Sequence, residues 1–147
     1  MKTTSIEELF REAISIRNQG DLQKAISSFE EIIKTYPNHP KISGVFTLLA
    51  GVYNDKGATH NAMLNFKKAT ELNPKSELAS LGLYLSYVKL EEYDKAIEEL
   101  GRYLDKYPAE RYKITLEELL TDLEQGYAIN YKGIIKELAQ KNGFKVK

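Results

Sequence analysis

The chain has 147 residues, of which 42% are hydrophobic and 29% charged, a composition typical of a single soluble domain. Its 21 lysines and arginines balance 21 aspartates and glutamates, which argues against a protein that coats nucleic acid or an anionic membrane. The absence of cysteine excludes disulfides, thiolate metal sites and thiol nucleophiles. No apolar run approaches the roughly 20 residues of a membrane span. No signal peptide is visible at the start. We therefore expect a cytoplasmic protein.

A repeat with constant internal spacing organises residues 1–110. In each copy a proline follows an alanine by 12 residues, and a large apolar residue lies four positions after that alanine. The alanine and proline pairs are Ala25 and Pro37, Ala62 and Pro74, and Ala96 and Pro108. This self-similarity predicts three stacked units. The units cover about 5–37, 42–75 and 76–109.

Each copy predicts two helices joined by a tight turn. In the first copy, Ser5 and Glu8 form a capping box ahead of an apolar stripe, and Asp21 follows Gly20 as an N-cap. The proline ends each pair, because its ring disfavours the α region for the residue before it. The alanine presents a small side chain that lets the two helices of a hairpin approach closely.

The repeats resemble the tetratricopeptide repeat (TPR), whose period is 34 residues. The middle copy matches that pattern best, with Phe46, Leu49, Ala50, Tyr53, Ala62, Phe66, Ala69 and Pro74. The third copy departs from it, with Ser80 at the tryptophan position and Tyr84 at the small-residue position. The resemblance implies an all-α fold, an α-solenoid of three TPR helix hairpins.

Residues 111–147 do not continue the repeat. Thr115 and Glu118 have the spacing of a capping box, which predicts a helix that starts there and ends near Gly126. A second amphipathic stretch ends at Asn142-Gly143, before a basic tail. We expect a two-helix cap on the open end of the third repeat; docking of these helices into a partner is the alternative. Tyr112, Tyr127 and Tyr131 suggest a further hypothesis, an aromatic contact patch around this cap.

The sequence contains no motif for catalysis, for a cofactor or for a metal ion. His39 and His60 are both expected in turns, and neither has a serine or acidic partner at the spacing of a triad. We interpret carboxylate pairs such as Glu98-Glu99 as solvated helix faces. The chain is therefore predicted not to be an enzyme and to need no cofactor and no metal.

The TPR resemblance implies a concave groove lined by the first helix of each pair, where such proteins commonly hold a peptide or a helix. Helical spacing places nine residues on that side: Phe10, Ile14, Arg17, Thr47, Gly51, Asn54, Leu81, Leu85 and Val88. Small residues at the centre, Thr47 and Gly51, predict the floor of an apolar pocket. The alternative interpretation is that these small residues allow adjacent helices to pack closely.

Co-chaperone TPR proteins grip an acidic C-terminus with a clamp of lysines, asparagines and arginine. That clamp is absent here, since the corresponding places hold Phe10, Ile14, Gly51, Leu78 and Gly82.

The leading hypothesis is a non-catalytic adaptor that binds an apolar or mixed peptide, or a helix, of a partner protein. One alternative is a self-associating structural module, for example a homodimer. Another is a small inhibitor or immunity-type protein that neutralises one partner. Neither nucleic acid nor a membrane is an expected partner.

Overall fold

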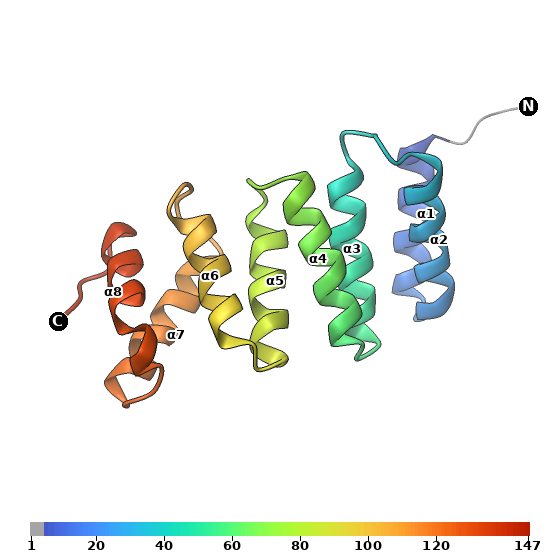
Figure 1. Cartoon of the computed structure of the whole chain (residues 1–147). Helices are drawn as coiled ribbons and strands as arrows, with labels where there is room; N and C mark the ends of the chain where they lie inside the picture. Colours follow the sequence, from blue (N-terminus) through green and yellow to red (C-terminus); the bar gives the residue numbers. More distant parts are fainter. Residues whose placement is uncertain (1–4) are drawn as a thin grey trace, which may run out of the picture.

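The computed structural model describes residues 5–147, which form eight α-helices and one 3₁₀ turn. The elements are α1 (Ile6–Asn18), α2 (Leu22–Thr35), α3 (Ile42–Asp55), α4 (Thr59–Leu72), α5 (Glu77–Lys89), α6 (Tyr93–Leu104), α7 (Tyr112–Glu124), η1 (Ile129–Tyr131) and α8 (Lys132–Lys141). Helices α1 to α6 pack on one another in chain order, and α7 packs on α8. Figure 1 shows the resulting row of hairpins, with α1 and α8 at opposite ends. The predicted all-α solenoid is confirmed.

Local signals start and end the first helices as the sequence predicts. Ser5 Oγ accepts the Glu8 N–H at 3.2 Å, and Asp21 Oδ1 accepts the Lys24 N–H at 3.2 Å. The turn after α1 contains Gly20 with φ +88°, a left-handed conformation that glycine adopts without steric conflict. In the turn after α5 the non-glycine residue Glu91 takes this conformation, with φ 59°. Such a conformation costs an L-residue about 1 kcal/mol.

The small and large residues of the repeat form the interior of each hairpin. Ala25, Ala62 and Ala96 are at most 1% exposed. The large residue one helical turn later in each copy is also buried: these are Phe29, Phe66 and Leu100. The repeated alanine is therefore a contact position between helices, as the sequence predicts.

The buried apolar residues form two clusters that meet in α3. The N-terminal cluster runs from Ile6 to Val52, and the C-terminal cluster runs from Ala50 to Leu138. The second cluster continues through residue 110 into α7 and α8. Residues 1–110 and 111–147 therefore do not have separate hydrophobic cores. The division between them stays a prediction about where the repeats end.

The predicted start of the helix after the third repeat is wrong. Helix α7 begins at Tyr112, three residues before Thr115. Thr115 is therefore an internal residue of the helix, and its side chain is buried against the rest of the protein. A distant side chain caps this helix. The Glu77 carboxylate accepts the backbone N–H groups of Glu110 at 2.8 Å, Arg111 at 2.7 Å and Tyr112 at 3.1 Å. These groups would otherwise lack partners at a helix start, so α5 determines where α7 begins.

Helices α7 and α8 cover the apolar end of the third repeat. Leu116 of α7 and Ile135 and Leu138 of α8 are buried in the same cluster as Leu100 of α6. The end of α8 is fastened to the loop after α6, since Asn142 Oδ1 accepts the Ala109 N–H at 2.8 Å. The two helices therefore pack on the third repeat, and their role as a cap stays a prediction.

Candidate protein-binding groove

The nine predicted groove residues lie on α1, α3 and α5, the first helix of each hairpin. Leu85 is 50% exposed and Asn54 is also exposed. The other seven are partly buried: Phe10, Ile14, Arg17, Thr47, Gly51, Leu81 and Val88. Their side chains do not all line one hollow. Ile14 packs against the N-terminal apolar cluster and Leu81 against the C-terminal one. Five of the others lie in three separate places.

At the centre, Arg17 occupies the space that Gly51 leaves. A Cβ atom on Gly51 would lie 2.9 Å from Arg17 Nη2 and 3.1 Å from Nη1. Arg17 Nε also donates a hydrogen bond to Asp55 Oδ2 at 2.9 Å, so the side chain reaches from α1 across to α3. The open apolar floor that the sequence predicts at Gly51 is therefore filled by a guanidinium group. Thr47 turns back to its own helix, where its hydroxyl donates to the Ser43 carbonyl at 3.0 Å.

At the N-terminal end, Phe10 packs between helices and also borders a hollow. Its ring meets that of Phe29 edge to face, with centroids 6.3 Å apart. The hollow has a volume of about 810 Å³ and lies between the starts of α1 and α3, where Ile6, Pro40 and Gly44 also line it. Phe10 thus borders a hollow at the N-terminal end of the solenoid.

At the C-terminal end, Val88 lines a hollow of about 470 Å³ that four tyrosines and several aliphatic side chains enclose. Its rings come from α5, the start of α6 and the connection between α7 and α8: they are Tyr84, Tyr93, Tyr127 and Tyr131. Leu119 and Asp122 of α7 also line it, as do Ala96 and Ile97 of α6 and Ala128 and Asn130 of the connection. We call this the tyrosine hollow.

Sequence reasoning identified only part of the tyrosine hollow. Tyr127 and Tyr131 belong to the predicted aromatic patch around the cap, and both line the hollow. Tyr112, the third member of that prediction, is wholly buried and belongs to the core. Tyr84 could have been suspected from the pattern, because a large ring replaces a small residue at its repeat position. Asp122 carries no local signal.

Two tyrosines of the hollow are held by specific contacts. The Tyr131 hydroxyl donates to Asp94 Oδ1 at 2.5 Å, which ties η1 to α6. The Tyr84 ring lies edge-on to Tyr112, with centroids 6.0 Å apart. Burial, and to a smaller extent the nearby carboxylates of Asp122 and Glu118, disfavour the phenolate and together raise the pKa of Tyr84 to about 12. Tyr93 and Tyr127 are 49% and 65% exposed and form the rim.

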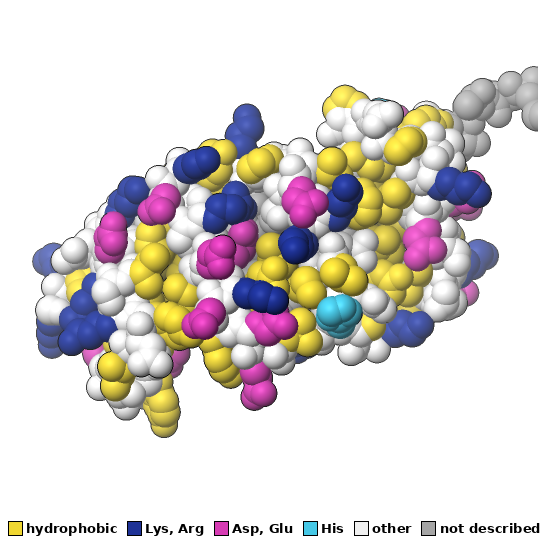
Figure 2. Space-filling view, viewed as in Figure 1, with side chains coloured by type: hydrophobic (Ala, Val, Ile, Leu, Met, Phe, Trp, Pro, Cys, Tyr) yellow, Lys and Arg dark blue, Asp and Glu magenta, His cyan; other side chains and the backbone are white. Residues whose placement is uncertain are grey.

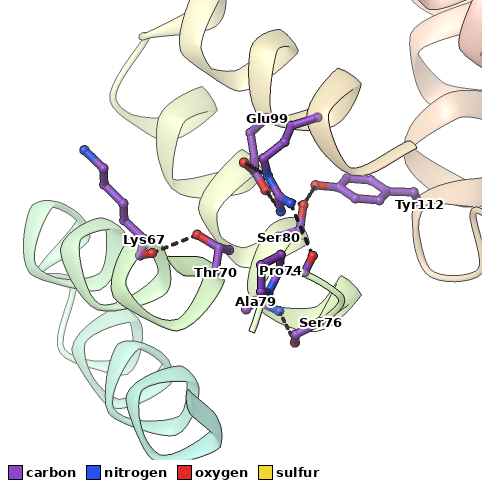
Figure 3. A network of polar contacts seen from close by, with 9 residues as sticks. Lys67, Thr70, Pro74, Ser76, Ala79, Ser80, Glu99 and Tyr112 are labelled. Atoms are coloured by element: carbon purple, nitrogen blue, oxygen red, sulfur yellow. Dashed lines mark hydrogen bonds and ion pairs between the residues drawn. The ribbon is translucent and has the colours of Figure 1, made fainter. Parts of the chain in front are cut away.

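A buried polar cluster joins α5, α6 and α7 in the C-terminal half (Figure 3). The Ser80 hydroxyl lies 2.6 Å from Glu99 Oε2 and 2.7 Å from the Tyr112 hydroxyl. Arg102 Nε and Nη2 donate to the two Glu99 oxygens, both at 2.7 Å, in the bidentate geometry typical of strong ion pairs. The interpretation of Glu98-Glu99 as a solvated pair is therefore wrong for Glu99, which is buried. The polar cluster also explains why a serine stands at the tryptophan position of the third repeat. The small Ser80 side chain leaves room for the Tyr112 ring and hydrogen-bonds to its hydroxyl.

The two histidines have ordinary surroundings. His39 lies in the turn before α3, where its Nδ1 accepts the Lys41 N–H at 3.1 Å. His60 is exposed and lies in the first turn of α4, not in the turn between helices as the sequence suggests.

Within residues 5–147, no three acidic or histidine side chains gather in a way that could hold a metal ion. Over the same residues, no helix is long and apolar enough to cross a bilayer.

Helical hairpins that pack on one another in chain order define a helical-repeat solenoid. Family models described as tetratricopeptide repeat match residues 9–39, 44–76 and 85–109. The chain therefore belongs to the tetratricopeptide repeat family, whose members mediate interactions between proteins.

A solved structure and two curated proteins illustrate what the chain is similar to. The crystal structure of a tetratricopeptide repeat protein from Parabacteroides merdae ATCC 43184 matches with a TM-score of 0.74 and 20% identity. That match covers 92% of this chain and 51% of the other chain, and it shows a shared fold.

The two curated proteins are each named Photosystem I assembly protein Ycf3. The protein from Synechococcus sp. (strain CC9605) is 29% identical over 80 residues, which cover 54% of this chain and 46% of the relative. That from strain WH7803 is 30% identical over 76 residues, covering 50% and 44%. The chain thus spans a little under half the length of these curated relatives.

Proposed function

We propose that the protein is a non-catalytic adaptor that binds a segment of a partner protein along α1, α3 and α5. The observation that carries the proposal is the exposed apolar surface at the C-terminal end of that face. Leu85 is half exposed in the middle of α5, and Val88 one turn later borders the tyrosine hollow. An exposed apolar side chain beside an aromatic hollow favours the burial of a partner's apolar residues.

The chemistry of this surface favours an apolar or mixed segment over an acidic C-terminus. The only cation among the nine predicted residues is Arg17, and its guanidinium is already paired with Asp55. The role named for the curated relatives, assembly of photosystem I, is compatible with an adaptor that holds one protein while a complex forms. We carry over no partner from those proteins.

A matched pair of variants tests the proposal. Leu85→Glu places a charge on the proposed surface, and Leu64→Glu places one at an equally exposed leucine on α4, since Leu64 is 48% exposed. Each variant and the wild type are used for affinity capture from native cell extract, followed by mass spectrometry, with helicity checked by circular dichroism. We expect one partner to be retained by wild type and Leu64→Glu and lost from Leu85→Glu.

Two other outcomes would contradict the adaptor. If Leu85→Glu retains the same partner as wild type, the partner binds elsewhere on the molecule. If wild type recovers only itself and light scattering gives a dimer mass that Leu85→Glu halves, the surface serves self-association.

A further inference from the structure

The lining of the tyrosine hollow is acidic, although the chain as a whole has no net charge. The whole chain is balanced, with 21 basic and 21 acidic residues. Among the residues described as lining the hollow, however, the single charged side chain is Asp122. A second, shallower hollow along α7 shares Asp122 and is lined by Ile114, Glu117, Glu118 and Thr121. No lysine or arginine lines either of these two hollows.

The Asp122 carboxylate is available to a ligand. Asp122 lies in the last turn of α7 and is partly buried. Its backbone carbonyl accepts the Tyr127 N–H at 2.8 Å, which folds the α7–α8 connection back over the hollow. Within residues 5–147, by contrast, no hydrogen bond or ion pair engages its side chain. A partly desolvated carboxylate with no partner attracts a cation more strongly than an exposed one does.

The rings around Asp122 supply the second half of a cation site. Tyr84 and Tyr131 are held in place by their contacts with Tyr112 and Asp94, while Tyr93 and Tyr127 stand exposed at the rim. The lower left of Figure 2 shows hydrophobic side chains standing out over the connection between α7 and α8. Aromatic faces attract cations, and a planar guanidinium stacks on them while pairing with a carboxylate.

We propose that the tyrosine hollow binds an arginine side chain presented by the partner segment. The guanidinium pairs with Asp122, and its aliphatic stem packs among the tyrosine rings. Glu117 and Glu118 in the neighbouring hollow favour a segment with a net positive charge. This inference rests on the proposed adaptor function and adds the chemistry by which one end of the groove selects its partner.

The test uses small probes and so does not depend on the identity of the partner. N-acetyl-arginine methylamide is titrated into the ¹⁵N-labelled full chain, and N-acetyl-citrulline methylamide serves as the neutral analogue of the same shape. We expect the arginine probe to shift backbone amide signals of residues 84–97 and 119–131, and the citrulline probe to leave them in place. We expect Asp122→Asn to weaken arginine binding by about tenfold, the loss typical of a charged hydrogen-bonded contact.

Two further variants separate the site from general electrostatics. Tyr127→Ala removes an exposed ring and is expected to weaken binding by about threefold. Glu31→Gln removes an exposed acid on α2 and is expected to leave binding unchanged. Equal shifts with the arginine and citrulline probes, shifts in other regions, or full binding by Asp122→Asn would each overturn the proposal. The Leu85→Glu capture experiment reports on the adaptor function separately, because a partner can be lost there whether or not arginine binds at Asp122.

Discussion

Gly51 and Gly82 both lie inside helices, yet the structure gives them different neighbours. A Cβ atom on Gly82 would lie 2.3 to 2.5 Å from three ring atoms of Phe66, which is itself buried. A Cβ atom on Gly51 would meet only the end of the flexible Arg17 side chain. Gly82 is therefore required for close packing of α5 on α4, whereas Gly51 is not.

We expect Gly82→Ala to lower the stability of the protein and Gly51→Ala not to lower it. Alanine improves helix propensity by about 1 kcal/mol at either position. In Gly82→Ala the overpacking of Phe66 outweighs that gain, and the free energy of unfolding falls by about 1 kcal/mol or more. In Gly51→Ala it stays the same or rises. Urea unfolding followed by circular dichroism measures both, and a Gly82→Ala protein as stable as wild type would refute the packing argument.

Tyr84 makes stability depend on pH in the alkaline range. Its pKa is about 12 in the folded protein, against about 10 for an ordinary tyrosine. The unfolded chain therefore releases this proton first as pH rises. The protonated Tyr84 hydroxyl therefore makes its full contribution to the free energy of unfolding below pH 10, and this contribution is lost between about pH 10 and pH 12.

We expect Tyr84→Phe to reduce the alkaline loss of stability. Between pH 9 and pH 11 the wild type should lose about 1 kcal/mol more than this variant, because the variant lacks the shifted hydroxyl. Urea midpoints at the two pH values give the comparison. An identical loss in both proteins would show that Tyr84 does not titrate as described.

Among the elements, α7 depends on a residue outside its own sequence. Glu77, the first residue of α5, accepts three backbone N–H groups around the start of α7. A capping side chain stabilises a helix by about 1 kcal/mol, and hydrogen bonds to a charged acceptor are stronger than neutral ones. The cap helices are therefore coupled to the third repeat by polar contacts as well as by apolar packing.

We expect Glu77→Ala to destabilise the protein by roughly 2 kcal/mol and to loosen α7 first. Hydrogen exchange read by mass spectrometry should show faster exchange over residues 110–124, with little change in α1 and α2. Glu7→Ala is the control, since Glu7 is an exposed carboxylate whose ion pair with Lys41, at 3.2 Å, is also exposed. Uniformly faster exchange in every helix of the Glu77→Ala protein would contradict a local capping role.

At the scale of the whole molecule, the two apolar clusters suggest that the ends of the solenoid can unfold separately. In a stack of repeats each unit contacts its neighbours only, so a defect at one end has its largest effect nearby. Phe29 belongs to the N-terminal cluster and Leu100 to the C-terminal cluster, and both are wholly buried.

We expect Phe29→Ala to cost about 3 to 5 kcal/mol and to open α1 and α2 while α5 to α8 stay protected from exchange. Leu100→Ala should show the reverse pattern, with α6 to α8 opening first. If both variants lose protection in all helices together, the chain unfolds as one cooperative unit and the nearest-neighbour description fails.

Most of the fold could be predicted from the sequence because its signals are local and repeated. The alanine and proline spacing identifies the hairpins, and the caps at Ser5 and Asp21 identify helix starts, since each depends on residues within one turn. The start of α7 could not be predicted in this way. Its capping carboxylate comes from Glu77, about 35 residues earlier, and the local capping-box pattern at Thr115 pointed to the wrong residue.

The sequence by itself determined the family, the hairpin repeat and which helices carry the proposed binding face. The tertiary structure decided what those residues touch: Arg17 fills the space over Gly51, Glu99 is buried with Ser80 and Arg102, and Asp122 faces a hollow lined by tyrosines. The physical reason is distance along the chain. Helix formation and capping depend on neighbours within a few residues, whereas the environment of a side chain depends on helices that meet only when the solenoid is folded.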